Sequence, residues 1–393
     1  MSYQDPTASS IELLNSMSSA HESASEFYAS ASSLLESKLY HQLTVEILSF
    51  TSSPTNCITL PDSSTNFSNI YNILFKLKSK LNPLMLTRIA CNVSRDTDIL
   101  SELMATDEIQ SAPHAKLFAQ AKLHLLTLMA NSSPSSDIVS TIQTFLKENK
   151  ITLQQLSAST ESEIASVHSA YHQTAMHLAK ITGPAQNYYH SAIEFLHYTP
   201  LTSLSEDEKK TLATDLCLAA LMGEGVYNLG TVVYDNQGLL ECLKGTENQY
   251  LVDLMTSAAE GSVLSDPSTL QEYEKHLAQK GCDVKVVEEK IMLLALIHMV
   301  FEKESHDRLL KFSEIADRLM IGLEQVEWVV MKALSLGLIK GSMDQVDGVV
   351  EVSWVMPRVL DEKGLNSLAN RFGDWAAKVD ETKAYMSEHI PAF

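Results

Sequence analysis

The chain has 393 residues, of which 45% are hydrophobic, and its formal net charge at pH 7 is −20. This is enough apolar material for two or three cores, and the negative charge disfavours binding to nucleic acid or to an anionic membrane. The five cysteines are far apart and form no CxxC pair, which argues against a disulfide framework and favours a reducing compartment.

Neither a secretory signal nor a membrane segment is expected. The first residues, MSYQDPTASS, lack the basic and apolar regions of a signal peptide. The longest apolar run, Ile291–Phe301, has eleven residues and contains His298, so it is too short to cross a bilayer. This run predicts a core helix.

Residues 1–160 predict a tail to about Ser10 followed by N-terminal helical repeats. Apolar residues recur at helical spacing even in the serine-rich first fifty positions. The composition of Ser52–Ser68 predicts a loop. Two helix pairs follow, at Ile70–Leu81 with Leu84–Val93 and at His114–Ala130 with Asp137–Glu148.

The clearest helix pair spans Glu161–Ile181 and Ala185–Tyr198, separated by Gly183-Pro184. Small residues on one helix face aromatic residues on the other, as in TPR-like hairpins, although no strict repeat period occurs. Four further helices are expected, at Asp207–Met222, Leu239–Leu243, Gln249–Glu260 and Asp266–Gln279. We assign residues 161–285 to the helical part of a second domain that ends at residue 357.

Residues 286–357 predict a winged helix. Its first helix is Val286–Glu302, and Ser313 is a suitable N-cap for a second helix that ends before Gly322. A third helix spans Leu323–Leu336. Two short strands, Leu338–Ile339 and Val349–Val355, flank a polar wing at Gly341–Gly348.

The third helix of this winged helix has the wrong charge for reading DNA. A helix that binds the major groove needs lysine and arginine to contact phosphate and guanine. Here the helix carries Glu324 and Glu327 with one Lys332. The pattern favours a winged helix used for protein assembly.

Five residues that join the third helix to the wing are expected to be largely buried: Trp328, Val329, Leu334, Leu336 and Leu338. In the second strand, valines alternate with Glu351 and Ser353, so one face is predicted to be core. The strand margin at Val349, Glu351 and Ser353 is predicted to be free to pair with a partner strand.

Residues 358–393 predict a C-terminal helix, at Asp361–His389, that serves assembly. Its apolar residues recur at spacings of three and four and form a narrow seam: Leu365, Leu368, Phe372, Trp375, Val379 and Met386. A helix docked in its own core usually has a broader apolar face, so the seam favours a bundle with helices of other chains.

No constellation of residues predicts catalysis, a cofactor or a metal. His168 and His172 are four residues apart on a helix, but the segment HSAYH lacks the glutamate of a zinc-protease helix. Gly223-Glu-Gly225 follows a helix rather than a strand, so a helix C-cap and turn explain it better than a nucleotide loop. The sequence predicts a protein that is not an enzyme.

Three stretches carry a resemblance to a known family. VVMKALSLGLIKG (Val329–Gly341), WVMPRVL (Trp354–Leu360) and LATDLCLAALMGEGVYNL (Leu212–Leu229) resemble the PCI family. Its members are assembly modules of the proteasome lid, the signalosome and translation initiation factor three. More narrowly, these stretches are similar to a non-ATPase subunit of the proteasome lid.

The resemblance implies a mostly α protein with TPR-like repeats, a winged-helix (PCI) subdomain with a small β wing, and a C-terminal helix. It implies a hetero-oligomer with other PCI and MPN subunits of the lid, in the cytoplasm and nucleus, without nucleic acid or membrane. The alternatives are a PCI subunit of the signalosome or of the initiation factor, and a winged-helix protein that binds nucleic acid.

Overall fold

The computed structural model describes residues 10–11, 13–16, 18, 25–52, 63–93, 97–130, 134–156, 161–261, 273, 275–303, 308–359 and 362–389. The chain forms two compact units, Met1–Pro200 and Leu201–Phe393. The predicted boundary at 160/161 falls between two helices of the first unit, and as a division between repeats it stays a prediction.

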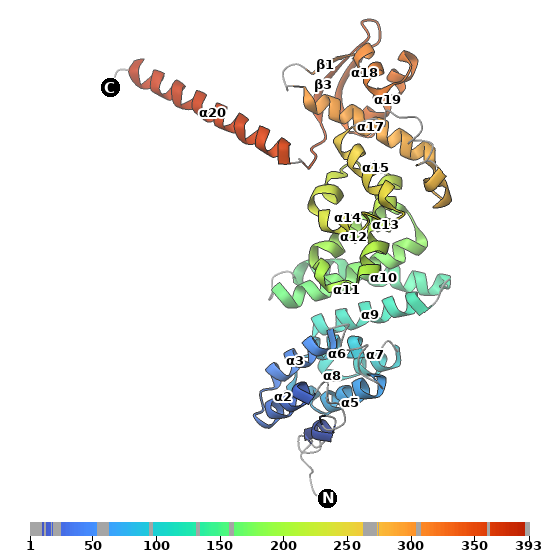
Figure 1. The fold of residues 1–393 in the computed structure, drawn as a ribbon, viewed down its shortest axis with the longest axis vertical. Helices are drawn as coiled ribbons and strands as arrows, with labels where there is room; N and C mark the ends of the chain where they lie inside the picture. Colours follow the sequence, from blue (N-terminus) through green and yellow to red (C-terminus); the bar gives the residue numbers. More distant parts are fainter. Residues whose placement is uncertain are drawn as a thin grey trace, which may run out of the picture. The chain divides into compact units, whose positions relative to one another are not determined.

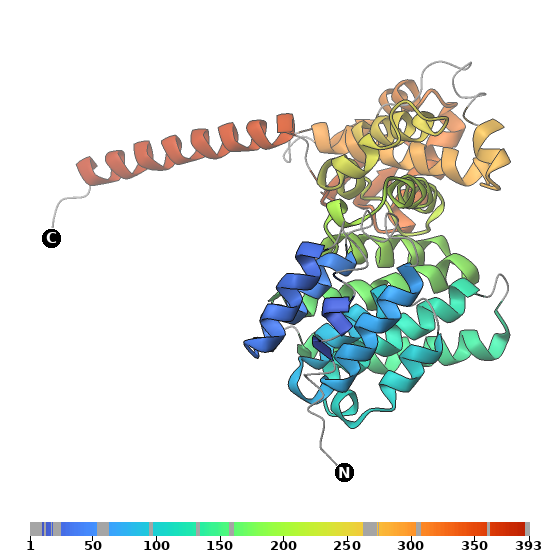
Figure 2. The ribbon, with the colours of Figure 1, turned by 60° about the horizontal axis from the view of Figure 1, so that its bottom comes forward.

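The first unit is helical, as predicted, and its successive helices are coloured from blue to green in Figures 1 and 2. Its described helices are α2 (Ser25–Glu36), α3 (Tyr40–Ser52), α5 (Ser63–Lys76), η2 (Lys78–Lys80), α6 (Pro83–Val93), α7 (Thr97–Met104), α8 (Asp107–Gln110), α9 (Pro113–Ala130), α10 (Ser136–Leu156), α11 (Glu161–Thr182) and α12 (Ala185–Tyr198). The expected loop at Ser52–Ser68 is wrong from residue 63 onward, where α5 begins, and 53–62 lie outside the described residues. Apolar residues after the serines, from Ile70, continue the helical spacing of α5.

The serine-rich helices are stabilised within their own turns. The hydroxyls of Ser32, Ser33 and Ser37 donate to carbonyls three or four residues earlier, at 2.8–3.2 Å. These bonds satisfy the hydroxyls without breaking the helix, although serine alone is a mediocre helix former. The core beneath them contains Tyr28 and Leu35, both almost fully buried.

Buried polar contacts fix α11 against the helices that precede it. The Thr174 hydroxyl donates to the Ala121 carbonyl of α9 at 2.9 Å, and the Tyr171 hydroxyl donates to the Leu146 carbonyl of α10 at 2.6 Å. Because these donors are shielded from water, their loss would leave unpaired polar groups in the core.

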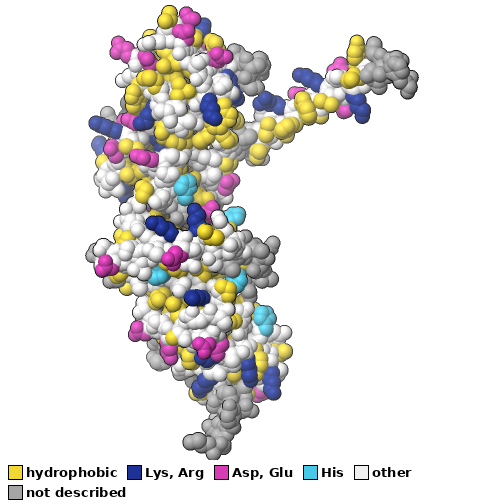
Figure 3. Space-filling model, turned by 180° about the vertical axis from the view of Figure 1, so that it is seen from behind, with side chains coloured by type: hydrophobic (Ala, Val, Ile, Leu, Met, Phe, Trp, Pro, Cys, Tyr) yellow, Lys and Arg dark blue, Asp and Glu magenta, His cyan; other side chains and the backbone are white. Residues whose placement is uncertain are grey.

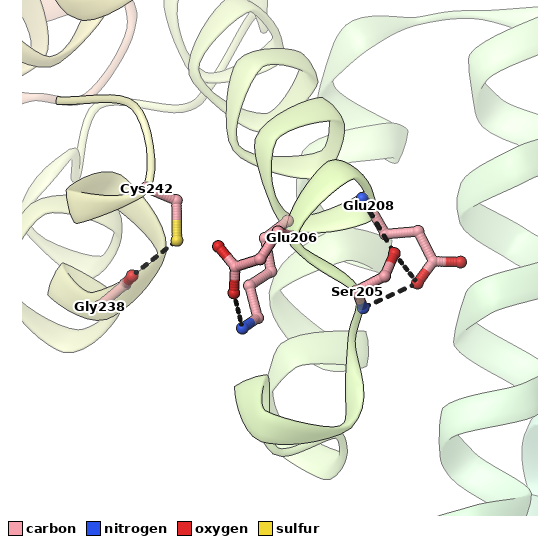
Figure 4. Close-up of polar contacts among 6 residues, drawn as sticks. Ser205, Glu206, Glu208, Gly238 and Cys242 are labelled. Atoms are coloured by element: carbon pink, nitrogen blue, oxygen red, sulfur yellow. Dashed lines mark hydrogen bonds and ion pairs between the residues drawn. The ribbon is translucent and has the colours of Figure 1, made fainter. Parts of the chain in front are cut away.

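The second unit begins with helical elements: η3 (Leu201–Ser203), α13 (Glu206–Met222), the π-helical turn η4 (Thr231–Asp235), α14 (Gln237–Glu241) and α15 (Gln249–Glu260). A capping box starts α13: the Ser205 hydroxyl accepts from the Glu208 backbone N–H, and the Glu208 carboxylate accepts from the Ser205 N–H (Figure 4). Most of the expected helix Asp266–Gln279 lies outside the described residues.

The winged helix comprises α17 (Val284–Glu302), β1 (Leu309–Lys311), α18 (Phe312–Leu319), α19 (Leu323–Ser335), β2 (Ile339–Asp344) and β3 (Val349–Val355), as labelled in part in Figure 1. The predicted N-cap at Ser313 is wrong: α18 begins at Phe312, and no side chain caps it. The sheet has a third strand, β1, which the sequence did not indicate because three residues are too few to show alternation.

The strand order is β1-β3-β2, with both pairings antiparallel. The prediction of a free margin at β3 is therefore wrong, since β3 is the central strand and both of its edges are paired. A bulge at Lys340/Gly341 bends the β2–β3 ladder. A Cβ at Gly341 would lie 2.0 Å from the Glu351 carbonyl oxygen, so this close approach requires glycine.

Burial in the winged helix confirms part of the predicted core. Val329 and Leu338 are buried and Leu334 is half-buried, but Trp328 and Leu336 are 45% and 42% exposed. The core face of α19 consists of Val326, Val329, Val330 and Ala333. Trp328 follows Val326 by two positions, which is half a turn or more around a helix and turns its ring away from the core.

The division of α19 into a buried face and an exposed face gives a first prediction. Val329→Ala should lower the free energy of unfolding by about 1–3 kcal/mol, because it removes buried methyl groups and leaves a cavity. Trp328→Ala, the adjacent exposed position, should cost well under half as much. Urea denaturation of the full-length chain measures both; equal losses would contradict the assigned face.

Candidate assembly surface

The C-terminal helix, α20 (Glu362–His389), presents its apolar seam to solvent. Phe372 and Trp375 are 62% and 65% exposed. The other predicted seam residues are also exposed: Leu365, Leu368, Val379 and Met386. Figure 3 shows apolar side chains running along this helix. Single exposed apolar residues are common, but a continuous row of them marks an interaction surface.

The three predicted interface residues of β3 retain only their side chains for contact. Glu351 and Ser353 are exposed and Val349 is half-buried. The Ser353 hydroxyl donates to the Lys340 carbonyl at 3.0 Å, so this side chain is already used within the hairpin. A role for these three residues in binding a partner stays a prediction.

Among the described strands, β1 and β2 form the two margins of the sheet. Of these two, β2 is long enough for extended pairing with another strand. The Val352 N–H donates to the Arg308 carbonyl at 3.0 Å, on the β1 side of β3. Because directions alternate along a strand, Glu351 faces β2, where its register partner is Ser342. The backbone N–H of the next residue, Met343, is therefore directed away from the sheet.

The outer face of α19 combines acidic and apolar side chains. Glu324 is exposed and Glu327 is half-buried, and the apolar side chains of Leu323, Trp328 and Met331 are exposed beside them. The Glu327 carboxylate accepts from the Gln345 side chain at 2.9 Å, which fixes the tip of the wing beside the helix. Negative charge at this position repels phosphate, as the sequence indicated.

A buried lysine joins the winged helix to the segment that begins with Gly223-Glu-Gly225. The Lys290 ammonium of α17 donates to the Ala220 carbonyl at 2.6 Å and to the Gly223 carbonyl at 2.8 Å, and it lies 5.4 Å from the centre of the Tyr227 ring. Lys290 is 5% exposed, and burial lowers its pKa to about 8. It donates to carbonyls at the C-terminal end of α13, where the last turn lacks intrahelical donors, and the Gly223 carbonyl also accepts from the Val226 N–H at 3.4 Å.

The glycine segment is a helix C-cap and turn, as predicted. Gly223 is the C-cap of α13, and Gly225 has φ of 78°, in the left-handed region that favours glycine. The sequence pattern does not single out Lys290, because it follows Glu288 and Glu289 and so reads as part of a charged, solvated face at the edge of the apolar run.

The two histidines of α11 form a stack of rings with Tyr198 of α12. The His168 and Tyr198 ring centres are 4.3 Å apart, and those of His172 and Tyr198 are 6.1 Å apart. Burial lowers the pKa of both histidines. At His168, the negative charge of Glu194 opposes this shift. At His172, the charge of His168 adds to the effect of burial, and the pKa falls to about 4. Among the described residues, no group of three or more potential ligands could hold a metal ion.

A pH dependence follows from this stack. The folded state disfavours the protonated histidines, so the unfolded chain binds more protons between pH 6.5 and about 4. The contribution of these histidines to the free energy of unfolding is therefore fully present above pH 6.5. As the pH decreases through this window, the free energy of unfolding should fall by up to roughly 3 kcal/mol. Melting curves of the full chain at pH 7.5 and pH 5 measure the loss. His172→Phe, which keeps a ring, should reduce it, whereas His190→Phe at an exposed site should not.

In the part of the chain that the structure describes, no helix is both long and apolar enough to span a membrane.

Helical repeats followed by a winged helix define the class of PCI-type assembly modules, and the PCI domain family model matches residues 270–354. A second family model, described as PSD13 N-terminal repeats, matches residues 27–255. The chain therefore belongs to the family defined by the PSD13 N-terminal repeats.

Curated relatives extend this similarity over most of the chain. "26S proteasome non-ATPase regulatory subunit 13" of Dictyostelium discoideum is 29% identical over 350 residues, which cover 87% of this chain and 88% of that protein. Homolog B of the same subunit from Arabidopsis thaliana is 28% identical and covers 97% of this chain and 98% of its own length. "26S proteasome regulatory subunit RPN9" of Saccharomyces cerevisiae is 28% identical over 55% of this chain and 54% of its own length.

Proposed function

We propose that this chain is a non-catalytic scaffold subunit of the regulatory particle lid of the 26S proteasome, which supports ubiquitin-dependent degradation by assembling with other PCI and MPN subunits. The observation that carries the proposal is membership in the PSD13 family, whose curated relatives bear the name of that regulatory subunit. The proposed locations are the cytoplasm and the nucleus, where such an assembly acts.

Two surfaces support an assembly role. The seam of α20 offers a row of exposed apolar side chains to a helix bundle, and the β2 margin offers unpaired backbone to a strand of a neighbouring subunit. The acidic outer face of α19 disfavours the nucleic-acid alternative.

Affinity purification of the tagged full-length chain from its own cells tests the proposal, with the partners identified by mass spectrometry. We expect other lid subunits in near-equal amounts. Recovery of signalosome or initiation-factor subunits in their place would support the alternatives, and recovery without any lid subunit would overturn the proposal.

The same purification tests the β2 margin. Met343→Pro removes an outward N–H, so it should lower lid recovery more than it lowers the melting temperature. Ser342→Pro removes an inward donor and should lower the melting temperature more. If Met343→Pro assembles normally, the β2 margin does not pair with a partner.

A further inference from the structure

The segment between the wing and the C-terminal helix, Met356–Val359, is bound to the body of the second unit along its length; we call it the exit strap. Its first residue continues from β3, where the Met356 N–H donates to the Leu338 carbonyl at 2.8 Å. Only residues 360 and 361 separate its last residue from α20. The path of the exit strap therefore determines where the helix starts.

Arg358 binds the exit strap to α15 and α17. Its guanidinium donates to the Ala259 carbonyl and, at 2.8 Å, to Nδ1 of His298. A guanidinium has only donors, so Nδ1 must accept and the imidazole is neutral, with its proton on Nε2. Nε2 lies 3.0 Å from the Glu302 carboxylate, which accepts that proton's hydrogen bond.

The contact between α15 and His298 requires a glycine. Gly261 ends α15 with φ of 68°, and a Cβ there would lie 2.3 Å from the His298 Cβ. This close approach brings the Ala259 carbonyl and His298 together, so that one guanidinium reaches both. The bonded groups therefore come from two helices, and Arg358 joins them to the exit strap.

A second, independent contact binds Val359. Its backbone N–H donates to the Asn228 side-chain oxygen at 3.3 Å, and its Cβ lies 2.9 Å from where a Cβ at Gly230 would be. Asn228 and Gly230 follow the segment that Lys290 holds. Two of the stretches that resemble the PCI family, Leu212–Leu229 and Trp354–Leu360, thus meet at the exit strap.

We propose that Arg358 and Asn228 are positioning residues for assembly: they lock the exit strap and so fix the point from which α20 enters its complex. The proposal rests on the proposed function, because α20 is taken to bind partner helices. A released exit strap would leave the seam intact but free to start from many positions, and ordering it would then reduce the binding free energy.

Two measurements on the full-length chain test this proposal. Asn228→Ala should make the Val359 amide exchange hydrogen up to about tenfold faster, because one hydrogen bond is lost, with no change in the winged-helix core. Asn228→Asp, which keeps the acceptor, should restore slow exchange. Arg358→Gln should likewise release residues 356–359, whereas the exposed control Lys280→Gln should not.

Incorporation into the lid, measured by co-purification, should fall severalfold in the double variant Asn228→Ala/Arg358→Gln while its melting temperature stays near that of Asn228→Asp. Unchanged exchange in the exit strap would overturn the lock, and normal incorporation despite fast exchange would overturn its role in assembly. A variant that lacks residues 363–393 distinguishes a failure of the exit-strap proposal from a failure of the proposed function. If the deletion also assembles normally, α20 is not needed at all.

Discussion

Removing Lys363–Phe393 should leave both units folded and abolish, or severely reduce, incorporation into the lid. The deletion starts beyond the exit strap, and the described side chains that it removes, at 364–386, are almost all exposed, so the described core loses almost nothing. In a bundle, the same seam would become buried. Each large apolar side chain that it buries contributes about 1.5–3 kcal/mol, before the cost of ordering is subtracted.

A milder variant distinguishes the seam from the helix itself. Phe372→Ser with Trp375→Ser keeps α20 but removes the centre of its apolar row. We expect a protein with an unchanged melting temperature that fails to co-purify with lid subunits. A matched control is Arg371→Ser with Asp374→Ser, on neighbouring positions outside the predicted seam. Normal assembly of the seam variant, or its unfolding in isolation, would show that the seam does not serve a bundle.

Lys290→Met should lower the free energy of unfolding by about 2–5 kcal/mol, the largest loss that we expect from a single substitution. Methionine keeps the length of the side chain but cannot donate, so the carbonyls of Ala220 and Gly223 would both lose the ammonium, and the Gly223 carbonyl would keep its long hydrogen bond from the Val226 N–H at 3.4 Å. Hydrogen bonds from a charged donor also contribute more than neutral ones.

Denaturant titration of the full chain measures this loss, and Lys285→Met on the exposed side of the same helix is the control. Lys290→Arg should recover part of the stability, since its guanidinium donates but fits the site poorly. A Lys290→Met protein as stable as the control would show that the two carbonyls find water or another donor.

The long elements of this fold could be predicted because helical periodicity is a local signal. The helices at Ala185–Tyr198 and Gln249–Glu260 match their predicted bounds, and α17, α19 and α20 differ from theirs by one or two residues. The β1 strand could not be predicted, because Leu309–Lys311 becomes a strand only through its pairing with β3. That one pairing also makes β3 the central strand and leaves β1 and β2 at the two margins of the sheet.

The candidate site likewise contains residues that a local sequence pattern predicts and residues that it does not. The α20 seam is a pattern in one helix, and its exposure in the chain was expected from its narrowness. Lys290, Arg358 and Asn228 instead bind partners between 60 and 131 positions away. No spacing along the chain reveals such contacts. Trp328 was misplaced because a large apolar residue was taken as core without following its angle around α19.

The exposed row on α20 also has a consequence for copies of the chain that never find a complex. Each such orphan keeps Phe372 and Trp375 in water, where a stripe of this kind invites self-association and capture by chaperones. If the proposed assembly role holds, chains made in excess of their partner subunits would therefore be degraded and would not accumulate, since the seam proposed to drive assembly would also mark the unassembled subunit.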